Sequence, residues 1–502
     1  MKSPKNEGFF AVPDDVAIIA KTLESKGFEA YLVGGCVRDI LIGRKPSDWD
    51  ITTNATPAQI IASFPKTFYE NEYGTVGVVN ESTTDESTRV VEVTPYRLEA
   101  KYSNSRHPDS VTFGTKLEDD LKRRDFTINA IALKVINGSK GHYKGHLKDI
   151  YGGLKDISEK SVKTVGKPEE RFTEDALRLM RAVRIATDLS FTINTDTERA
   201  ILLNAEKLRV ISKERVRDEF VKIIMSDSPK MGIGLLNKLG LLQFIVPELQ
   251  KGIGVAQNKA HTFDVWEHSL RTVEHAARKS WPLEVRLAAL LHDIGKPQTR
   301  RWSSEKKDWT FYGHDVIGAK IAVKVLSMLR FPVKTIEKVA KLVRWHMFFS
   351  NTEQITLSAV RRLVSRVGKD DIWDLMSVRI CDRIGTGRPK ESPYRLRKYK
   401  SMIEEVMRDP ISVGMLKING SVIMSKTGLK PGVKIGMILH ALLEEVLDDP
   451  QRNTVDYLEK RAKELAELND EDLKALGQKG KETKEKTDQK AINEIRRKYW
   501  VK

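Results

Sequence analysis

The sequence contains few cysteines and no long apolar run. Among its 502 residues there are two cysteines, Cys36 and Cys381, which cannot form a disulfide framework or a cysteine-rich zinc site. No stretch approaches the roughly 18 apolar residues that a membrane span needs, and the N-terminal segment lacks the apolar core of a secretion signal. We therefore expect an intracellular, cytoplasmic protein with no membrane association.

What the chain does have is an excess of positive charge. Lys and Arg number 86 against 69 for Asp and Glu, which gives a formal net charge of +17. Such an excess predicts a polyanionic partner, most often nucleic acid, although charge alone says nothing about fold. Apolar residues make up 40% of the chain, which is enough for ordinary cores. At roughly 150 residues per domain, the length predicts three or four domains.

The hydrophobic pattern changes near residue 150. Before it, short strand-like runs such as Glu29–Val33 alternate with helical segments such as Cys36–Ile42, and Asn137-Gly138 is typical of a turn. Beyond about residue 168, apolar residues recur three and four apart in nearly every segment, which indicates helices. We predict an α+β protein with a small mixed-sheet head followed by all-helical parts, divided at 1–150, 151–250, 251–395 and 396–502.

The first chemical pattern is GGCVRDILIGRKPSDWDITT, residues 34 to 53. On a strand, Asp48 and Asp50 point to the same face, and two adjacent carboxylates repel unless a cation lies between them. Mg²⁺ binds carboxylates together with substrate phosphates. Gly34 and Gly35 stand where a strand turns into a helix, so their backbone N–H groups can face a phosphate that Arg38 also contacts. The pattern predicts a Mg²⁺ and polyphosphate site.

Two further patterns are basic. LKRRDFTINAIA, residues 121 to 132, contains Arg124, and RFTEDALRLMRAVRIA, residues 171 to 186, predicts a helix starting near Thr173. In that helix four polar residues are spaced three apart, and because such a row drifts about 60° per step they cannot all face one point. We expect the first two to meet a base together and the last two to lie nearer the phosphates or RNA; the four are Asp175, Arg178, Arg181 and Arg184.

An Asp/Arg pair can select between bases. Cytosine and adenine each present an amino donor beside a ring-nitrogen acceptor, so a carboxylate accepts from the first and a guanidinium donates to the second. Guanine and uracil reverse that order and leave both protein groups unpaired. Asp175 and Arg178 could therefore admit CTP and ATP and reject GTP and UTP.

A fourth pattern places histidines and aspartates in apolar helical segments between residues 261 and 385. Imidazole and carboxylate groups suit Zn²⁺, Ni²⁺, Mn²⁺ or Fe²⁺, and the sequence does not choose among these metals. A metal of this kind lowers the pKa of a bound water, which can then attack a phosphate ester. The residues are His268, His292, Asp293, His314, His346 and Asp382.

The first three patterns, in this order, resemble the signatures of the class II tRNA nucleotidyltransferases, which include the CCA-adding enzymes, and of the related bacterial poly(A) polymerases. The resemblance implies that Asp48 and Asp50 hold two Mg²⁺ ions, one activating an RNA 3′-hydroxyl and one steadying the triphosphate, and that Arg124 contacts the nucleotide. It also implies that YSNSRHPDSVTFG, residues 102 to 114, acts as a flexible lever when specificity switches from C to A. Asn104, where an acid is common, is a departure of little weight.

The histidine–aspartate pattern resembles the HD phosphohydrolase superfamily, in which a helical core gathers such residues around one or two divalent metals. In this resemblance His314 and His346 complete a two-metal site, and some CCA-adding enzymes carry such a domain with phosphatase and 2′,3′-cyclic phosphodiesterase activities. LKPGVKIG, residues 429 to 436, resembles the region after that domain, and a glycine turn before a helix also accounts for it.

We therefore expect an enzyme that adds CCA to tRNA 3′ ends from CTP and ATP and also hydrolyses phosphate esters. Basic helices such as Lys213–Lys222 would hold the acceptor–TΨC arm of the tRNA, and no protein partner can be inferred. Alternatives within the family are poly(A) polymerase and enzymes that add only CC or only A. Alternatives of another class are a metal-dependent phosphohydrolase whose head only anchors RNA, and a non-catalytic RNA-binding protein.

Overall fold

The structure is a computed structural model that describes residues 7–69, 74–97, 113–259, 261–347, 356–407, 416–448, 450–469, 471–473, 476 and 493–501. The chain divides into two compact units, residues 1–344 with 381–387 and residues 345–380 with 388–502. Among the described residues, no helix is both long and apolar enough to cross a membrane.

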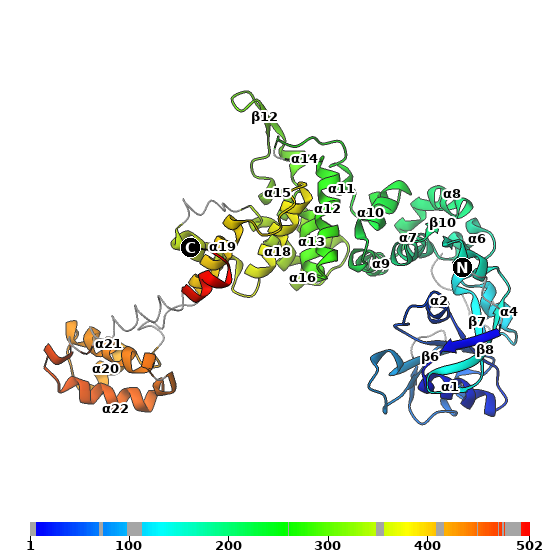
Figure 1. The fold of residues 1–502 in the computed structure, drawn as a ribbon, viewed down its shortest axis with the longest axis horizontal. Coiled ribbons are helices and arrows are strands. Elements are labelled where there is room, and N and C mark those ends of the chain that lie inside the picture. The colour runs from blue at the N-terminus through cyan, green and yellow to red at the C-terminus, as the bar shows by residue number, and fades with distance from the viewer. Residues whose placement is uncertain are drawn as a thin grey trace. The chain divides into compact units, whose positions relative to one another are not determined.

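The first unit begins with an eight-stranded mixed sheet in the order β1-β8-β7-β2-β3-β6-β5-β4 (Figure 1). Neighbouring strands are antiparallel except β3 and β6, which are parallel. The eight strands are β1 (Glu7–Ala11), β2 (Ala30–Val33), β3 (Asp50–Thr53), β4 (Thr67–Tyr69), β5 (Val76–Val79), β6 (Val90–Pro95), β7 (Ile131–Ser139) and β8 (His142–Asp149).

Helices pack beside this sheet because its central strands are apolar on both faces. β2 is buried at all four of its positions, and its side chains share a core with α1 (Asp14–Ser25) and α2 (Gly35–Leu41). The remaining helices of the head are α3 (Pro57–Ile61), α4 (Leu117–Lys122) and α5 (Gly153–Ser158).

The rest of the first unit is almost entirely helical. A short parallel pair, β9 (Ser161–Val162) and β10 (Thr192–Ile193), and a hairpin, β11 (Arg301–Ser303) and β12 (Asp308–Thr310), are its strands among the described residues. Its helices are α6 (Pro168–Glu174), α7 (Leu177–Leu189), α8 (Thr195–Asn204), α9 (Lys213–Met225), α10 (Pro229–Lys238), α11 (Pro247–Gln250), α12 (Val265–Arg278), α13 (Leu283–Leu291), α14 (Lys296–Thr299), α15 (His314–Met328) and α16 (Val333–Trp345).

The second unit is helical in its described part. The last turn of α18 (Ile372–Gly385) belongs to the first unit, which includes residues 381–387. The apolar core of its C-terminal part includes Ile423, Leu442 and Leu458. The other helices are α17 (Leu357–Val367), α19 (Tyr394–Met407), α20 (Gly420–Thr427), α21 (Val433–Asp448) and α22 (Val455–Ala466).

The α+β class, with a mixed-sheet head and helical parts after it, is confirmed, but two local predictions are wrong. The turn between β7 and β8 falls at Lys140-Gly141, both with positive φ, and not at Asn137-Gly138, which lies within β7. No helix starts near Thr173, because α6 ends at Glu174 and α7 begins at Leu177. The predicted lever loop at 102–114 lies almost wholly outside the described residues, as does much of the charged tail.

Candidate active sites: a carboxylate pair and a histidine–aspartate centre

Asp48 and Asp50 flank a residue that anchors them in the head. Trp49 is buried in the core, whereas Asp48 is exposed just before β3 and Asp50 is half-buried at the first position of that strand. The prediction that both carboxylates lie on the strand is therefore wrong for Asp48. Burial raises the pKa of Asp50 to about 6; the Arg124 guanidinium opposes this rise and the Asp48 carboxylate adds to it. Such a destabilised carboxylate is stabilised by a divalent cation.

A third carboxylate lies on the neighbouring strand. Glu92 of β6 is the register partner of Asp50 of β3 in the parallel pair, so both side chains leave the same face of the sheet. Its backbone N–H donates to the Trp49 carbonyl at 3.0 Å, and its side chain is exposed. The set of Asp48, Asp50 and Glu92 fits Mg²⁺, which prefers carboxylate oxygens.

Gly34 allows the end of β2 to approach this carboxylate set. A Cβ at Gly34 would lie 2.8 Å from Asp50 Oδ2 and 3.2 Å from Arg124 Nη1, and the residue has a φ of +86°. Only glycine adopts that conformation without strain and leaves room for both groups. Gly35 begins α2, and its Cβ position would lie 3.5 Å from Arg38 Nη2.

The predicted nucleotide-contacting arginines of the head are held by acids and amides. Arg124 Nη2 donates to Asp120 Oδ2 at 3.3 Å, and Asp120 is fully buried. Arg38 donates from Nε to Asp39 at 2.9 Å and from Nη1 to Asn129 at 2.8 Å. These contacts fix the direction of both guanidinium groups and lower the entropy that each would lose on binding a phosphate.

Asp125 links the head to α7. Its Oδ2 accepts from Arg181 Nε at 2.8 Å, and its Oδ1 accepts from the Asn129 side chain at 3.2 Å. Burial alone would raise the pKa of Asp125, but the Arg181 guanidinium holds it well below its usual value. Asp125 in turn raises the pKa of Arg181. Arg181 therefore joins the two parts of the first unit, which sequence spacing could not reveal.

Asp175 lies in the break between α6 and α7, in an extended conformation. Its Oδ1 accepts from the N–H of Leu177, the first residue of α7, at 3.0 Å, and its Oδ2 accepts from Arg215 Nη2 of α9 at 2.7 Å. Arg178, the second residue of α7, donates to Glu174 Oε2 at 2.5 Å and to the Arg123 carbonyl at 3.0 Å. The break thus brings Asp175 and Arg178 to the end of a helix that points at the head.

The last residue of the predicted row, Arg184, faces the helical body. Its Nε lies 2.7 Å from Glu219 Oε2 of α9 and its Nη1 lies 3.8 Å from Asp188. Arg181 and Arg184 therefore point to different partners, in agreement with the drift expected along a helix face.

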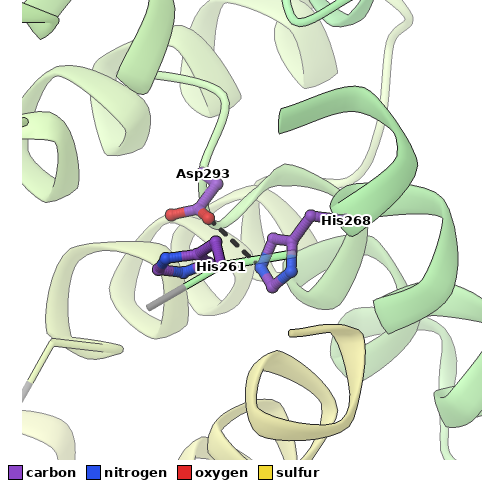
Figure 2. Close-up of side chains that lie close together, drawn as sticks. All are labelled: His261, His268 and Asp293. Atoms are coloured by element: carbon purple, nitrogen blue, oxygen red, sulfur yellow. Dashed lines mark ion pairs between the residues drawn. The ribbon is translucent and has the colours of Figure 1, made fainter. Parts of the chain in front are cut away.

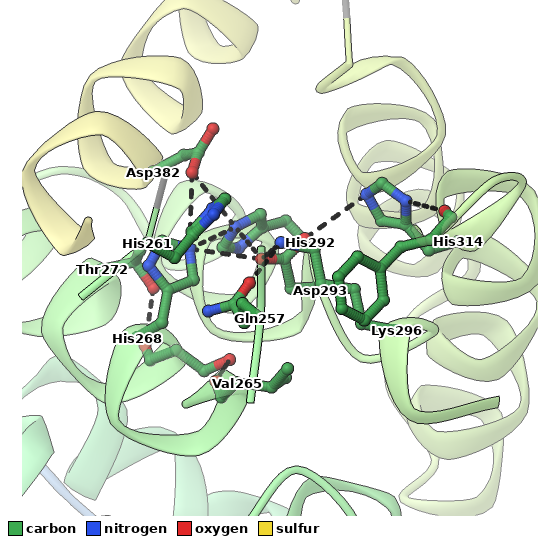
Figure 3. Close-up of polar contacts among 12 residues, drawn as sticks. Gln257, His261, Val265, His268, Thr272, His292, Asp293, Lys296, His314 and Asp382 are labelled. Atoms are coloured by element: carbon green, nitrogen blue, oxygen red, sulfur yellow. Dashed lines mark hydrogen bonds and ion pairs between the residues drawn. The ribbon is translucent and has the colours of Figure 1, made fainter. Parts of the chain in front are cut away.

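Five of the six residues of the fourth pattern lie close together in the first unit (Figure 3). His268 Nε2 of α12 lies 3.1 Å from His292 Nε2, 3.2 Å from Asp293 Oδ2 and 3.4 Å from Asp382 Oδ1 of α18. His314, the first residue of α15, lies 3.4 Å from Asp293 Oδ1. All five are buried. His346 is also buried, directly after α16, and is counted in the second unit.

Hydrogen bonds fix which nitrogen of each ring faces the centre. The Nδ1 of His292 lies 2.8 Å from the Ala289 carbonyl, and the Nδ1 of His314 lies 2.6 Å from the Phe311 carbonyl. Because a carbonyl only accepts, each Nδ1 carries a hydrogen and each Nε2 faces the carboxylates. Metal-ligating histidines are oriented in this way.

The buried carboxylates of the centre are stabilised by positive charge beside them. Burial alone would lower the pKa of His292, but the Asp293 and Asp382 carboxylates raise it to about 10. The pKa of Asp293 lies well below its usual value, although burial alone would raise it, because His292 and Lys296 lie beside it. A proton on His292 thus offsets the buried negative charge in the metal-free protein, and the donor set fits a divalent metal in its place.

Comparison with known proteins follows the same division of the chain. Residues 30–163 match the Poly A polymerase head domain, residues 190–253 the probable RNA and SrmB-binding site of polymerase A, and residues 265–385 the HD domain. The CC-adding tRNA nucleotidyltransferase of Thermus thermophilus is 33% identical over 83% of this chain and 89% of its own length. This chain belongs to the tRNA nucleotidyltransferase family.

The names of other family members specify different added nucleotides. The CCA-adding enzyme of Geobacillus thermodenitrificans is 32% identical over 87% of this chain and 93% of its own length. The A-adding tRNA nucleotidyltransferase of Deinococcus radiodurans is 33% identical over 83% of this chain and 91% of its own length. The crystal structure of the Bacillus stearothermophilus CCA-adding enzyme with CTP superposes with a TM-score of 0.57 at 28% identity, over 90% of this chain and 96% of that one.

In this tRNA nucleotidyltransferase, sequence reasoning missed three residues: one beside the carboxylate pair, one that holds Asp175, and one at the histidine–aspartate centre. Glu92 could have been found only by knowing that β6 pairs with β3 in parallel, and Arg215 only by knowing that α9 reaches the break before α7. His261 lies with His268 and Asp293 in a group whose ligand atoms are within 4.8 Å of one another (Figure 2). A signal for His261 was present, since it stands seven residues before His268 in HTFDVWEH.

Proposed function

We propose that this enzyme adds CCA to the 3′ end of tRNA, using CTP and ATP. The observation that carries the proposal is the carboxylate set of Asp48, Asp50 and Glu92, with the Arg124 guanidinium beside Asp50. Polymerising nucleotidyl transfer uses such a set, because carboxylates that hold Mg²⁺ bring positive charge to the triphosphate and to the attacking hydroxyl. The names of the relatives, which specify CC, CCA or A addition to tRNA, support the same reaction class.

In the proposed reaction the 3′-hydroxyl oxygen of the tRNA bonds to the α-phosphorus of the nucleotide. The bond from that phosphorus to the bridging oxygen of the β-phosphate breaks, pyrophosphate leaves, and the hydroxyl proton passes to solvent. Two Mg²⁺ ions held by the carboxylates of Asp48, Asp50 and Glu92 would supply Lewis acidity for both oxygens. Arg38 and Arg124, already oriented by Asp39 and Asp120, would bind the triphosphate.

Base selection is proposed for Asp175 and Arg178. The Asp175 carboxylate would accept from the amino group of cytosine or adenine, and the Arg178 guanidinium would donate to the ring nitrogen. Arg215 and Glu174 hold these two groups in place at the break before α7. Because both groups sit at the end of α7, they can read a base stacked between the head and the helical body.

We further propose a division of labour along the chain. Residues 1–150 carry out the transfer, 151–250 select the nucleotide and hold the acceptor–TΨC arm, 251–395 form the phosphohydrolase domain, and 396–502 form a helical tail region. The cytoplasm, which contains tRNA and both nucleotides, is the proposed location.

The decisive test is incorporation on a tRNA transcript that lacks its 3′ CCA, with Mg²⁺ and all four nucleotides, followed by sequencing of the product ends. We expect termination after CCA. The relatives with CC and A addition are as similar to this chain as the CCA-adding ones. The intact loop sequence at 102–114 argues against CC-only addition, and this experiment decides between CCA and A-only addition. Termination after CC, addition of A alone, or a long A tail would each replace the proposal with the corresponding activity.

A second activity, hydrolysis of phosphate esters, is favoured by the buried histidine–aspartate centre. One or two divalent ions, of Ni²⁺, Zn²⁺, Mn²⁺ or Fe²⁺, would lie among His268, His292, Asp293 and Asp382, with His314 and His346 completing a two-metal set, and would supply a water of lowered pKa. The Nδ1–H contacts of His292 and His314 keep their Nε2 atoms aimed at that position.

Two substitutions separate the two activities. Asp48→Ala should lower incorporation by about a thousandfold, because Lewis-acid stabilisation is worth several kcal/mol, and should leave ester hydrolysis standing. His292→Ala should do the reverse. Incorporation that survives Asp48→Ala would contradict the assignment of the transfer site, and hydrolysis that disappears with Asp48→Ala would contradict an independent second centre.

A further inference from the structure

The β11–β12 hairpin projects from the helical part of the first unit beside α14 (Figure 1). It follows α14, which contains Lys296, and leads through Phe311 to His314 at the start of α15. On its other side, the Asp308 carboxylate accepts from the Lys259 N–H at 3.1 Å, two residues before His261. The hairpin is therefore attached at both sides to segments that supply groups to the centre.

The hairpin presents aromatic rings to solvent. Trp302 and Trp309 are register partners on the two strands, and their rings meet edge to face with centroids 5.2 Å apart. Trp302 is 56% exposed, and Tyr312, between the hairpin and the centre, is 74% exposed. Large aromatic side chains exposed together in this way mark surfaces that bind a partner with a flat apolar face.

Cations accompany these rings. The Arg300 guanidinium stacks on Trp309 at 3.6 Å from the ring centroid, and Lys306 Nζ donates to the Tyr312 hydroxyl at 2.6 Å. The Asp308 carboxylate is occupied by two backbone N–H groups. Between residues 300 and 312 the hairpin carries four cations against two acids; the cations are Arg300, Arg301, Lys306 and Lys307.

We propose that this hairpin binds the single-stranded 3′ end of an RNA and delivers its terminal phosphate ester to the histidine–aspartate centre. Bases would stack on Trp302 and Tyr312, which is possible for every base because each has a π face, and the cations would bind the backbone phosphates. The substrate class is thus an RNA end of several nucleotides in preference to a free mononucleotide. The inference rests on the proposed hydrolysis, in which a water oxygen bonds to phosphorus, the bond to the ribose oxygen breaks and that oxygen takes a proton.

The test compares two substrates on the full-length protein loaded with Mn²⁺ or Ni²⁺: a hexanucleotide RNA with a 3′-phosphate and the matching 3′-mononucleotide. For Trp302→Ala combined with Tyr312→Ala, the ratio of kcat/KM for the long substrate to that for the short one should fall about tenfold. The single variant Trp302→Phe keeps a ring at this position, so its ratio should stay close to that of the wild type. An unchanged ratio would overturn the proposal, as would a parallel loss of CCA addition, which would assign the hairpin to tRNA binding for the transfer reaction.

A second measurement separates failure of this proposal from failure of the proposed hydrolysis. Binding of the fluorescein-labelled hexanucleotide is followed by anisotropy in EDTA, where no hydrolysis occurs. The double variant should bind about tenfold more weakly than the wild type, and Trp500→Ala, which removes an 83% exposed tryptophan elsewhere, should bind as the wild type does. If no metal supports hydrolysis but this difference persists, the hairpin proposal stands and the hydrolase proposal fails; equal binding by all three proteins would overturn the hairpin proposal.

Discussion

The Asp175 carboxylate forms an ion pair with Arg215, forty residues further along the chain, at 2.7 Å. Spacing along the sequence suggested Arg178 as the neighbour of Asp175, but the helix is interrupted between them and α9 supplies the guanidinium instead. The pair holds an extended residue in place between two helices. It also leaves Arg178 to be positioned by Glu174 and by backbone carbonyls.

This pair predicts that Arg215 contributes to base selection without contacting the base. Arg215→Ala should lower kcat/KM for CTP and ATP by about tenfold and reduce discrimination against GTP and UTP, because the freed carboxylate can leave its position. The measurement is incorporation with each nucleotide separately. Arg209→Ala removes a 67% exposed guanidinium from the same part of the chain and serves as the control. Equal losses for all four nucleotides would show that Arg215 affects folding or tRNA binding only.

The sequence predicts those structural features that depend on neighbouring residues, and it does not predict contacts between distant segments. The strand before Gly34 and the helix over Lys213–Met225 follow from short-range apolar periodicity, and both were predicted. The break at Asp175 was missed, because an acidic residue before an apolar run looks like an ordinary helix start. Contacts between distant segments, such as Asp125 with Arg181, depend on packing that no single segment encodes.

The raised pKa of Asp50 predicts a gain in stability when its charge is removed. Its folded pKa of about 6 exceeds the unfolded value, so folding takes up a proton and stability declines as the pH rises from about 4 to 6. In EDTA at neutral pH, Asp50→Asn should therefore raise the Tm, with a gain of about 1–3 kcal/mol, and at pH 4 the gain should vanish. Asp48→Asn, at an exposed position, should change the Tm less.

Thermal unfolding with added Mg²⁺ completes this experiment. Mg²⁺ should raise the Tm of the wild type by occupying the carboxylates and should raise that of Asp50→Asn far less. A lower Tm for Asp50→Asn in EDTA would show that the ionised carboxylate is not destabilised by burial.

His261 is predicted to bind metal at the histidine–aspartate centre. Its Nδ1 lies 2.8 Å from Asn258 Oδ1, an acceptor, so Nδ1 carries the hydrogen of the neutral ring and Nε2 is left with its lone pair. Burial and the nearby Lys296 lower the pKa of His261 to about 4, which keeps the ring neutral at physiological pH. His261→Ala should weaken binding of Mn²⁺ or Ni²⁺ by about 10–100-fold in calorimetry. His440→Ala, at an exposed histidine, is the control, and unchanged affinity for His261→Ala would exclude it from the metal site.

The close approach of Gly34 to Asp50 predicts a loss of transfer activity from a single methyl group. In Gly34→Ala the new Cβ would lie 2.8 Å from Asp50 Oδ2, so the carboxylate must move, and a displacement of this size costs about 10–100-fold in kcat. Gly43→Ala separates contact from strain, because Gly43 has a similar φ of +76° and no described atom lies within 4 Å of its Cβ position. Both variants should lose at least about 1 kcal/mol of stability, measured by thermal unfolding, since both place alanine at a positive φ, and Gly34→Ala should lose more because Gly34 has a ψ of −143° that is essentially restricted to glycine. Only Gly34→Ala should lose incorporation on tRNA, and an equal loss in Gly43→Ala would trace the defect to backbone strain near the head instead of to the metal-binding carboxylate.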